Sequence, residues 1–430
     1  MAATMKNLQP LATFFAFALL LESSQAADWT QYRGPNHDGS TVEKIPAKWP
    51  ASGLRTLWKV PAPGGFSSFA VSQGLAVTQV IREGRECVVA LDAMTGKEAW
   101  AVELGAADYG HNGGNAGAKG NDGGDGPRST PTLDGDHAYV LSSDLRLWCL
   151  NAKSGKKAWM VDLMAEHGGP NIKWKNAASP LLDGDQVFVA GGGAGSTFLA
   201  FDKLTGKVFW KSGTETITHA TPVRTTLHGV AQVIFFVQSG LVSLDRATGR
   251  ELWRQAFRFS VSTAISPVVA QDVVYCSAGY GVGGGAYRIS KTDGKWAAEE
   301  QWRAHGNGQS ANHWSTPLHR EGHLYGVFGF KEYATGPVKC VELATGAVKW
   351  QKPNFGAGNA VLAGGHLLVL TDLGDLVLLA AQAAEQPELA RAHVVDGKCW
   401  STPALSNGRV YVRSTKEAAC VELPRALSSR

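Results

Sequence analysis

A small group of cationic and aromatic residues stands at a fixed distance from one recurring dipeptide, Ser-Pro or Thr-Pro. Two positions before the Ser or Thr of this dipeptide the chain places Arg128, His219, Trp314 and Trp400. Arginine forms paired hydrogen bonds with carboxylates and phosphates, and the face of an indole stacks on flat rings. The combination therefore indicates a binding site for a flat ligand that is anionic or rich in hydroxyl groups.

Polar and aromatic neighbours extend this group. The candidate ligand-binding residues are Arg128, Trp174, Lys175, Asn176, His219, Asn312, His313, Trp314, Lys398 and Trp400. The chain has no HExxH and no GxSxG motif, and it has no calcium loop of the D-x-[DN]-x-[DN]-G type. We therefore predict ligand contacts here, but no catalytic and no metal-binding residues.

The elements that must position these residues follow from two repeats. ALDAMTGKEAW (90–100) recurs at 149–159, 200–210, 243–253 and 340–350, and the Ser/Thr-Pro dipeptide or a weaker copy occurs eight times at spacings near 45 residues. Within each period, Asp-Gly, Asn-Gly or Thr-Gly turns separate short apolar runs, a pattern typical of β-hairpins. Eight such periods predict an all-β fold, an eight-bladed β-propeller with four-stranded antiparallel blades.

The repeated eleven residues are interpreted as structural. The acid at Asp92 can accept backbone N–H groups across its turn, and Gly96 can adopt a left-handed conformation. Trp100 and its equivalents offer the largest side chain for packing between neighbouring blades. We expect these tryptophans to dock one blade onto the next, not to bind a ligand.

The last period lacks its tryptophan strand, and residues 57–60 (LWKV) near the N-terminus can supply it. The ring is then closed by an N-terminal strand. The predicted organisation is a signal peptide over 1–26, an N-terminal segment over 27–56 and a single propeller domain over 57–430.

Two links between blades exceed what such a ring requires, namely 100–131 and 159–180. Long loops on a rigid scaffold tend to carry function. Both should lie on the rim opposite the Thr-Gly turns, at the mouth of the central channel. The glycine-rich part of the first, 110–126, is either a lid or disordered. The alternative interpretation of the mouth is that Trp314 and Trp400 plug the channel while the backbone satisfies His219 and His313.

The motif A-x-D-x-x-T-G-x-x-x-W resembles the tryptophan-docking motif of the pyrroloquinoline-quinone (PQQ) repeat propellers, and the resemblance extends over about 29–423. That superfamily is quinoprotein alcohol dehydrogenase-like, and it includes those dehydrogenases, an outer-membrane-assembly lipoprotein and exported members without an assigned role. The opening DWTQYRGPNHDG (28–39) resembles the start of the exported members. The dehydrogenases of this superfamily bind PQQ and calcium and carry an adjacent Cys-Cys pair, which this chain lacks.

The N-terminus indicates export. Lys6, the apolar run LATFFAFALLL (11–21) and the small residues before Ala27 form the three parts of a signal peptide, and the run is too short to span a bilayer. We therefore expect a periplasmic or secreted protein without a transmembrane segment, and a monomer. The net charge of +4 gives no indication of a nucleic-acid partner.

The six cysteines have two interpretations. In an exported protein they suggest disulfides. However, Cys149, Cys340 and Cys420 occupy a repeat position that elsewhere holds Ala or Ser, which indicates a tight buried strand site. The pairing of Cys87, Cys276 and Cys399 stays open.

These observations favour a non-catalytic module that binds or scaffolds a protein or a glycan outside the cytoplasm, without a cofactor. The alternative is a PQQ-dependent dehydrogenase that uses calcium to oxidise an alcohol or a sugar.

Overall fold

A computed structural model describes residues 28–109, 126–260, 262–329 and 332–424. The predicted signal peptide and nearly all of the glycine-rich segment 110–126 lie outside the described residues. In the described part of the chain, no helix is both long and apolar enough to cross a membrane.

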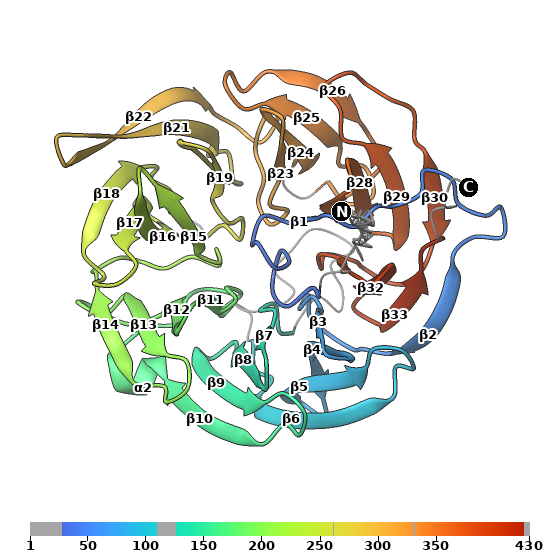
Figure 1. Ribbon diagram of the computed structural model, residues 1–430, viewed down its shortest axis with the longest axis horizontal. Coiled ribbons are helices and arrows are strands. Elements are labelled where there is room, and N and C mark those ends of the chain that lie inside the picture. The colour runs from blue at the N-terminus through green and yellow to red at the C-terminus, as the bar shows by residue number, and fades with distance from the viewer. Residues whose placement is uncertain (1–27, 110–125, 261, 330–331, 425–430) are drawn as a thin grey trace, which may run out of the picture.

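Eight antiparallel sheets stand around a central axis and follow one another in chain order, so the predicted eight-bladed propeller is confirmed (Figure 1). Blade 1 shows the common pattern: β3 (Ala70–Ser72) is innermost, and β4 (Leu75–Arg82), β5 (Arg85–Asp92) and β6 (Glu98–Ala106) follow outward. In this blade the innermost strand has only three residues, whereas the others have eight or nine.

The next four blades repeat this order. Their strands are β7 (Thr132–Asp134), β8 (His137–Leu141), β9 (Arg146–Asn151) and β10 (Lys157–Asp162) in blade 2; β11 (Leu181–Asp183), β12 (Gln186–Ala190), β13 (Phe198–Asp202) and β14 (Val208–Ser212) in blade 3; β15 (Val223–Leu227), β16 (Val230–Val237), β17 (Gly240–Asp245) and β18 (Glu251–Ala256) in blade 4; and β19 (Val268–Ala270), β20 (Val273–Ala278), β21 (Gly283–Thr292) and β22 (Lys295–Ala304) in blade 5. One short helix, α2 (Leu163–His167), interrupts the link from blade 2 to blade 3.

Blades 6 to 8 complete the ring. They contain β23 (Leu318–Arg320), β24 (His323–Val327), β25 (Val338–Glu342) and β26 (Val348–Lys352); β27 (Asn359–Ala363), β28 (His366–Leu370), β29 (Asp375–Ala380) and β30 (Ala390–His393); and β31 (Ala404–Ser406), β32 (Arg409–Arg413), β33 (Glu417–Glu422) and β2 (Arg55–Pro61). In β2, Trp58 lies opposite Cys420 of β33, so the predicted closure by the N-terminal strand is confirmed. Blade 7 differs from the prediction of four strands, because β1 (Ser40–Thr41) adds a fifth, parallel to β27.

The repeated motif docks each blade onto the next, as predicted. Asp92 Oδ1 accepts the backbone N–H groups of Met94 and Thr95 at 3.0 and 2.8 Å, which fixes the turn. Trp100 is buried, and its Nε1 donates to the carbonyl oxygen of Ala152 in the following blade at 2.8 Å. A Cβ added to Gly155 of that blade would stand 2.8 Å from the indole of Trp100, so glycine is needed there for space and for its φ of +70°.

The residue that faces the docking tryptophan across the strand pair is always small. Cys149 lies opposite Trp159, Cys340 opposite Trp350 and Cys420 opposite Trp58, where other blades place Ala or Ser. All six cysteines are buried and free, so the interpretation of these three as tight strand positions is confirmed.

The Ser/Thr-Pro dipeptides form a belt around the axis. The backbone N–H of Thr130 donates to Ser179 Oγ, and the backbone N–H of Ser179 donates to Thr221 Oγ1, each at a distance of 2.9 Å. At the closure, the N–H of Thr402 donates to Ser68 Oγ at 2.8 Å. Each of these three hydroxyls, of Ser179, Thr221 and Ser68, ties its own inner strand to the preceding one, which favours Ser or Thr at this repeat position.

Residues 28–45, here called the prologue, lie across one end of the ring (Figure 1). The carbonyl oxygens of Trp29 and Thr30 accept from Val71 in blade 1 and Leu133 in blade 2. Further along, Arg33 Nη2 donates to the Pro317 carbonyl of blade 6, and Glu43 accepts two backbone N–H groups from the turn of blade 8. The prologue therefore occupies the end of the ring where the tight turns lie, and leaves the opposite end to the long links.

Candidate functional site

Seven aromatic rings form a continuous arc at the end of the ring opposite the prologue. Successive ring centroids lie 4.6 to 6.5 Å apart, within the range of favourable aromatic pairs. In order, the rings of this arc are Phe66, Trp400, Trp314, His313, Tyr280, Trp174 and His219. All come from links between blades or from the central hairpin of blade 5, which is the rim that the repeat predicts for the mouth.

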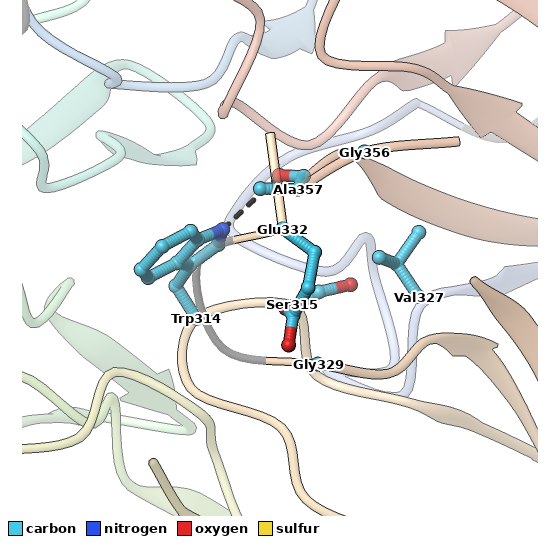
Figure 2. A pocket seen from close by; sticks show the side chains of 7 residues that line it. All are labelled: Trp314, Ser315, Val327, Gly329, Glu332, Gly356 and Ala357. Atoms are coloured by element: carbon cyan, nitrogen blue, oxygen red, sulfur yellow. Dashed lines mark hydrogen bonds between the residues drawn. The ribbon is translucent and has the colours of Figure 1, made fainter. Parts of the chain in front are cut away.

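The two central tryptophans of the arc stack on each other. The Trp314 and Trp400 rings lie 4.6 Å apart at an angle of 28°, and both side chains are half-buried. Trp314 Nε1 donates to the Ala357 carbonyl at 3.1 Å (Figure 2). Beside Trp314 lies a cavity of about 10 Å³, the space of about one water molecule. A ligand larger than water would therefore lie against the faces of the arc, not in this cavity.

Trp174 reaches the arc in a strained backbone conformation. Trp174 and Lys175 have φ values of 67° and 60°, two consecutive non-glycine residues in the left-handed region. Such a conformation costs of the order of 1–2 kcal/mol per residue and persists only where surrounding contacts hold it. Arg128 Nη1 donates to the Trp174 carbonyl at 2.9 Å, and His219 Nε2 lies 3.1 Å from the Lys173 carbonyl.

His219 acts as an anchor for this loop. Burial, with a smaller contribution from the charge of Arg128, lowers the pKa of its imidazole to about 4. The ring is therefore neutral near pH 7, and because a carbonyl oxygen only accepts, the proton sits on Nε2. The backbone thus satisfies His219, as the alternative interpretation of the mouth supposed, and its ring edge still completes the arc.

Cations lie over the arc at both ends. Lys398 Nζ stands 4.8 Å from the centroid of the Trp400 ring, and Lys173 Nζ stands 4.7 Å from that of Trp174. Arg128 adds a third cation, 5.8 Å above the ring of Tyr109. This pairing of cations with ring faces is suited to anionic or ring-shaped groups.

Three of the predicted site residues are used elsewhere. Lys175 forms an ion pair with Asp144 at 2.9 Å. Asn176 and Asn312 are fully buried, and their amides bond backbone groups: Asn176 Oδ1 accepts from Ala178 N at 3.0 Å, and Asn312 Nδ2 donates to the Val327 carbonyl at 2.7 Å. Lys175, Asn176 and Asn312 therefore support the site from behind. The predicted residues that the structure brings together are Arg128, Trp174, His219, His313, Trp314, Lys398 and Trp400.

Two features of the mouth escaped the sequence prediction. Tyr280 joins His313 to Trp174, although it belongs to a hairpin that carries no Ser/Thr-Pro dipeptide. Glu86 is a buried carboxylate that accepts from Tyr109 Oη at 2.8 Å and from Ser143, and burial raises its pKa. Glu86 shares a strand face with Val88 and Ala90, and an acid on an otherwise apolar face is the signal that could have found it.

Among the described residues, the donor set at the mouth does not match the requirements of PQQ with calcium. Calcium needs six to eight oxygen ligands, carboxylates among them. Within the described ranges, no three His, Cys, Asp or Glu side chains gather to hold a metal, and the amides of Asn176 and Asn312 are committed to the backbone. All six thiols are buried and free, so none forms a disulfide cover for a quinone face. No reaction step through the quinone follows from this arrangement.

Comparison with known proteins agrees with the fold. A family model described as outer membrane protein assembly factor BamB matches residues 50–212, 194–322 and 334–423. The quinoprotein ethanol dehydrogenase of Pseudomonas aeruginosa is 31% identical over 134 residues, 28% of this chain and 21% of that enzyme, so the chain matches only about a fifth of this curated relative.

Two solved structures are similar at low identity. BamB from Moraxella catarrhalis superposes with a TM-score of 0.59 at 16% identity, over 86% of this chain and 100% of that one. Quinohemoprotein alcohol dehydrogenase from Comamonas testosteroni gives 0.64 at 13% identity, over 93% and 82%. These likenesses show the propeller fold. Because the family model matches most of this chain, the chain belongs to the PQQ-repeat β-propeller family described as outer membrane protein assembly factor BamB.

Proposed function

We propose that this protein is a non-catalytic binding module that presents the aromatic arc, with its flanking cations, to a protein or glycan partner outside the cytoplasm. The observation that carries the proposal is the arc itself. Aromatic side chains at the centre of a recognition surface bury a large contact area and lose little conformational entropy on binding. Cations paired with these rings help to orient the bound partner.

The use of the polar groups supports binding over catalysis. His219 bonds the Lys173 carbonyl of the Trp174 loop, and the side-chain amides of Asn176 and Asn312 form hydrogen bonds with backbone groups. Glu86 is enclosed by Ser143 and Tyr109. These four groups, which could have served an acid, a base or a metal, are already occupied in maintaining the shape of the mouth. The strain at Trp174 supports the same proposal, because strained residues gather at functional sites.

The family supports a role in assembly, since the matching model describes an assembly factor. A location outside the cytoplasm is part of the proposal and is supported by the apolar run at 11–21. Fractionation of expressing cells, with N-terminal sequencing of the product, tests the location: processing before Ala27 is expected, and an unprocessed cytoplasmic product would contradict it.

The test of the binding role compares full-length chains that differ at the arc. Wild type, a Trp174→Ala/Trp400→Ala double variant and a Trp296→Ala control are immobilised and exposed to an extracytoplasmic extract and to a panel of oligosaccharides. Trp296 lies on the β21–β22 hairpin, outside the arc. We expect wild type and control to retain the same partner and the double variant to lose it. Equal retention by all three would move the binding surface away from the mouth.

The dehydrogenase alternative is favoured by one observation, the 31% identity to a quinoprotein ethanol dehydrogenase over 134 residues. Its test adds PQQ and Ca²⁺ to the purified chain and follows dye reduction with ethanol and glucose. We expect no turnover, and turnover that depends on both additions would replace the binding proposal.

A further inference from the structure

A second concave region lies at the other end of the ring, where the prologue crosses it. There a cleft of about 370 Å³ separates the prologue from the inner strands of blades 4 and 5. Arg33, His37 and Asp38 line it from the prologue, and Arg224 and Thr226 line it from β15. The cleft is distant from the aromatic arc, because these residues stand at the opposite ends of the inner strands.

Arg33 is a buried cation that has only carbonyl partners. Arg33 is 4% exposed. Its Nε donates to the His37 carbonyl at 3.0 Å, and its Nη2 donates to the Asp38 carbonyl at 2.9 Å. No carboxylate of the described residues forms an ion pair with it, and Nη1 is buried without an acceptor among them. A buried guanidinium without a counter-ion is costly, and a bound anion would offset that cost.

His37 stands beside Arg33 with a second unsatisfied atom. The residue is 5% exposed, and its Nε2 is buried with no partner in the part of the chain that the structure describes. Burial, followed by the charges of Arg224 and Arg33, lowers the pKa of the ring to about 3. The two guanidinium groups therefore lie close to this imidazole, which is neutral near pH 7.

The nearby carboxylates are engaged elsewhere. Asp38 Oδ1 accepts from the backbone N–H and the hydroxyl of Ser40, both at 2.8 Å. Asp183 pairs with Arg224 at 2.8 Å and is shared with Arg246 at 2.6 Å. Neither carboxylate is within ion-pair distance of Arg33, so its charge is balanced only from further away, by Asp38, and a ligand could balance it more closely.

We propose that this cleft binds a small oxyanion, a phosphate or carboxylate group, whose oxygen atoms complete the hydrogen bonds of Arg33 and His37 beside Arg224. Two cations and an imidazole line one wall of this cleft, and a nitrogen each of Arg33 and His37 is buried beneath it without a partner among the residues described. The remaining volume leaves room for the molecule that carries the anionic group. The site is separate from the mouth, and it neither requires nor excludes the binding role proposed there.

The test uses a matched pair of substitutions at Thr226, an exposed residue that lines the cleft and takes no part in the bonds of Arg33. Thr226→Glu places a negative charge in the cleft, and Thr226→Gln provides the same bulk without charge. Full-length proteins are titrated calorimetrically with sodium phosphate and with sodium acetate at constant ionic strength and pH 7.

We expect one saturable site per wild-type chain, affinity of the Gln variant within about twofold of wild type, and at least about tenfold weaker binding by the Glu variant. Phosphate should also raise the melting temperature of wild type but not that of the Glu variant. Preference for phosphate or for acetate identifies the anionic group. The absence of saturable binding of both anions, or equal affinity in the two variants, would overturn the proposal.

Discussion

Arg128 Nη1 donates a hydrogen bond to the backbone carbonyl of Trp174 over 2.9 Å. Each residue comes from one of the two links that are longer than the ring requires. The bond therefore joins the two long loops to each other, and it holds a tryptophan backbone that is strained in the left-handed region. The mouth is one connected structure and not two independent loops.

Removing this bond should loosen the Trp174 loop. We expect Arg128→Ala to lower the free energy of unfolding by about 1.5–3 kcal/mol, the range for a hydrogen bond to a charged group. Amide hydrogen exchange should accelerate over 172–176, because the strained turn loses one of the side chains that bond its backbone. The matched control is Arg288→Ala, an exposed arginine paired with Asp272. Unchanged exchange in the Arg128 variant would show that the loop holds its conformation unaided.

The docking tryptophans should be among the most sensitive positions for stability. Trp253 is 4% exposed and donates to Gln232 Oε1 at 2.7 Å. We expect Trp253→Ala to lower the free energy of unfolding by about 3–5 kcal/mol, as for other buried large-to-small changes, with ligand affinity of the folded fraction retained. Trp296→Ala on the partly exposed hairpin should cost less. Chemical denaturation measures both, and a Trp253 variant of wild-type stability would refute the docking role.

Blade 2 offers a controlled test of the glycine in the docking motif. Gly155 and Gly135 both have positive φ, 70° and 55°, but a Cβ at Gly155 would meet Trp100 at 2.8 Å whereas one at Gly135 would meet nothing within 4 Å. Gly135→Ala should therefore cost only about 1 kcal/mol of backbone strain. Gly155→Ala should cost about 1–3 kcal/mol more, because the indole must move. Equal losses would mean that the indole adjusts freely.

The neutral His219 should make stability sensitive to acid. The unfolded chain protonates this ring near pH 6.5, whereas the native chain does so only near pH 4. Between these values the unfolded state binds more protons, so stability falls as the pH falls from about 6.5 to about 4. His219→Gln, which keeps a donor for the Lys173 carbonyl, should reduce this loss of stability on acidification. Part of the loss should remain, because His37 also has a lowered pKa.

A histidine of the opposite kind serves as control for that experiment. The hydrogen bond from His393 to Asp375 raises the pKa of His393, so its contribution to stability is present below about pH 6.5 and is lost as the pH rises through the raised value. His393→Gln should therefore remove stability on the acid side. Melting temperatures over pH 4 to 8 for both variants would reveal the two signs, and parallel curves would contradict them.

The fold could be read from the sequence because its determinants are local and periodic. The acid, the Thr-Gly turn and the tryptophan lie within eleven residues, and copies in register define the blades and the missing strand that β2 supplies. The mouth was located by the same means, since the position before each Ser/Thr-Pro dipeptide is set by the ring.

What the sequence could not reveal are contacts that no period generates. Arg128 and His219 can bond the Trp174 loop only because Trp174 and Lys175 adopt left-handed backbone conformations. Neither Trp nor Lys prefers that conformation. Glu86 meets Ser143 across 57 positions, and Arg33 meets Pro317 across 284. These pairs depend on how blades and prologue are placed in space, which residue types alone leave undetermined.

The prologue also constrains the order of folding. The partners of Arg33 and Glu43 in blades 6 and 8 lie 284 and 364 positions later in the chain. Closing such long loops is slow, because entropy is lost before the contacts form. The contacts of Arg33 and Glu43 are therefore among the last to form, although Trp29 and Thr30 bond the early blades 1 and 2. A nascent chain that stops before blade 8 leaves β2 without its partner strand and Glu43 without the turn that it binds, and an exposed strand edge of this kind invites association between copies.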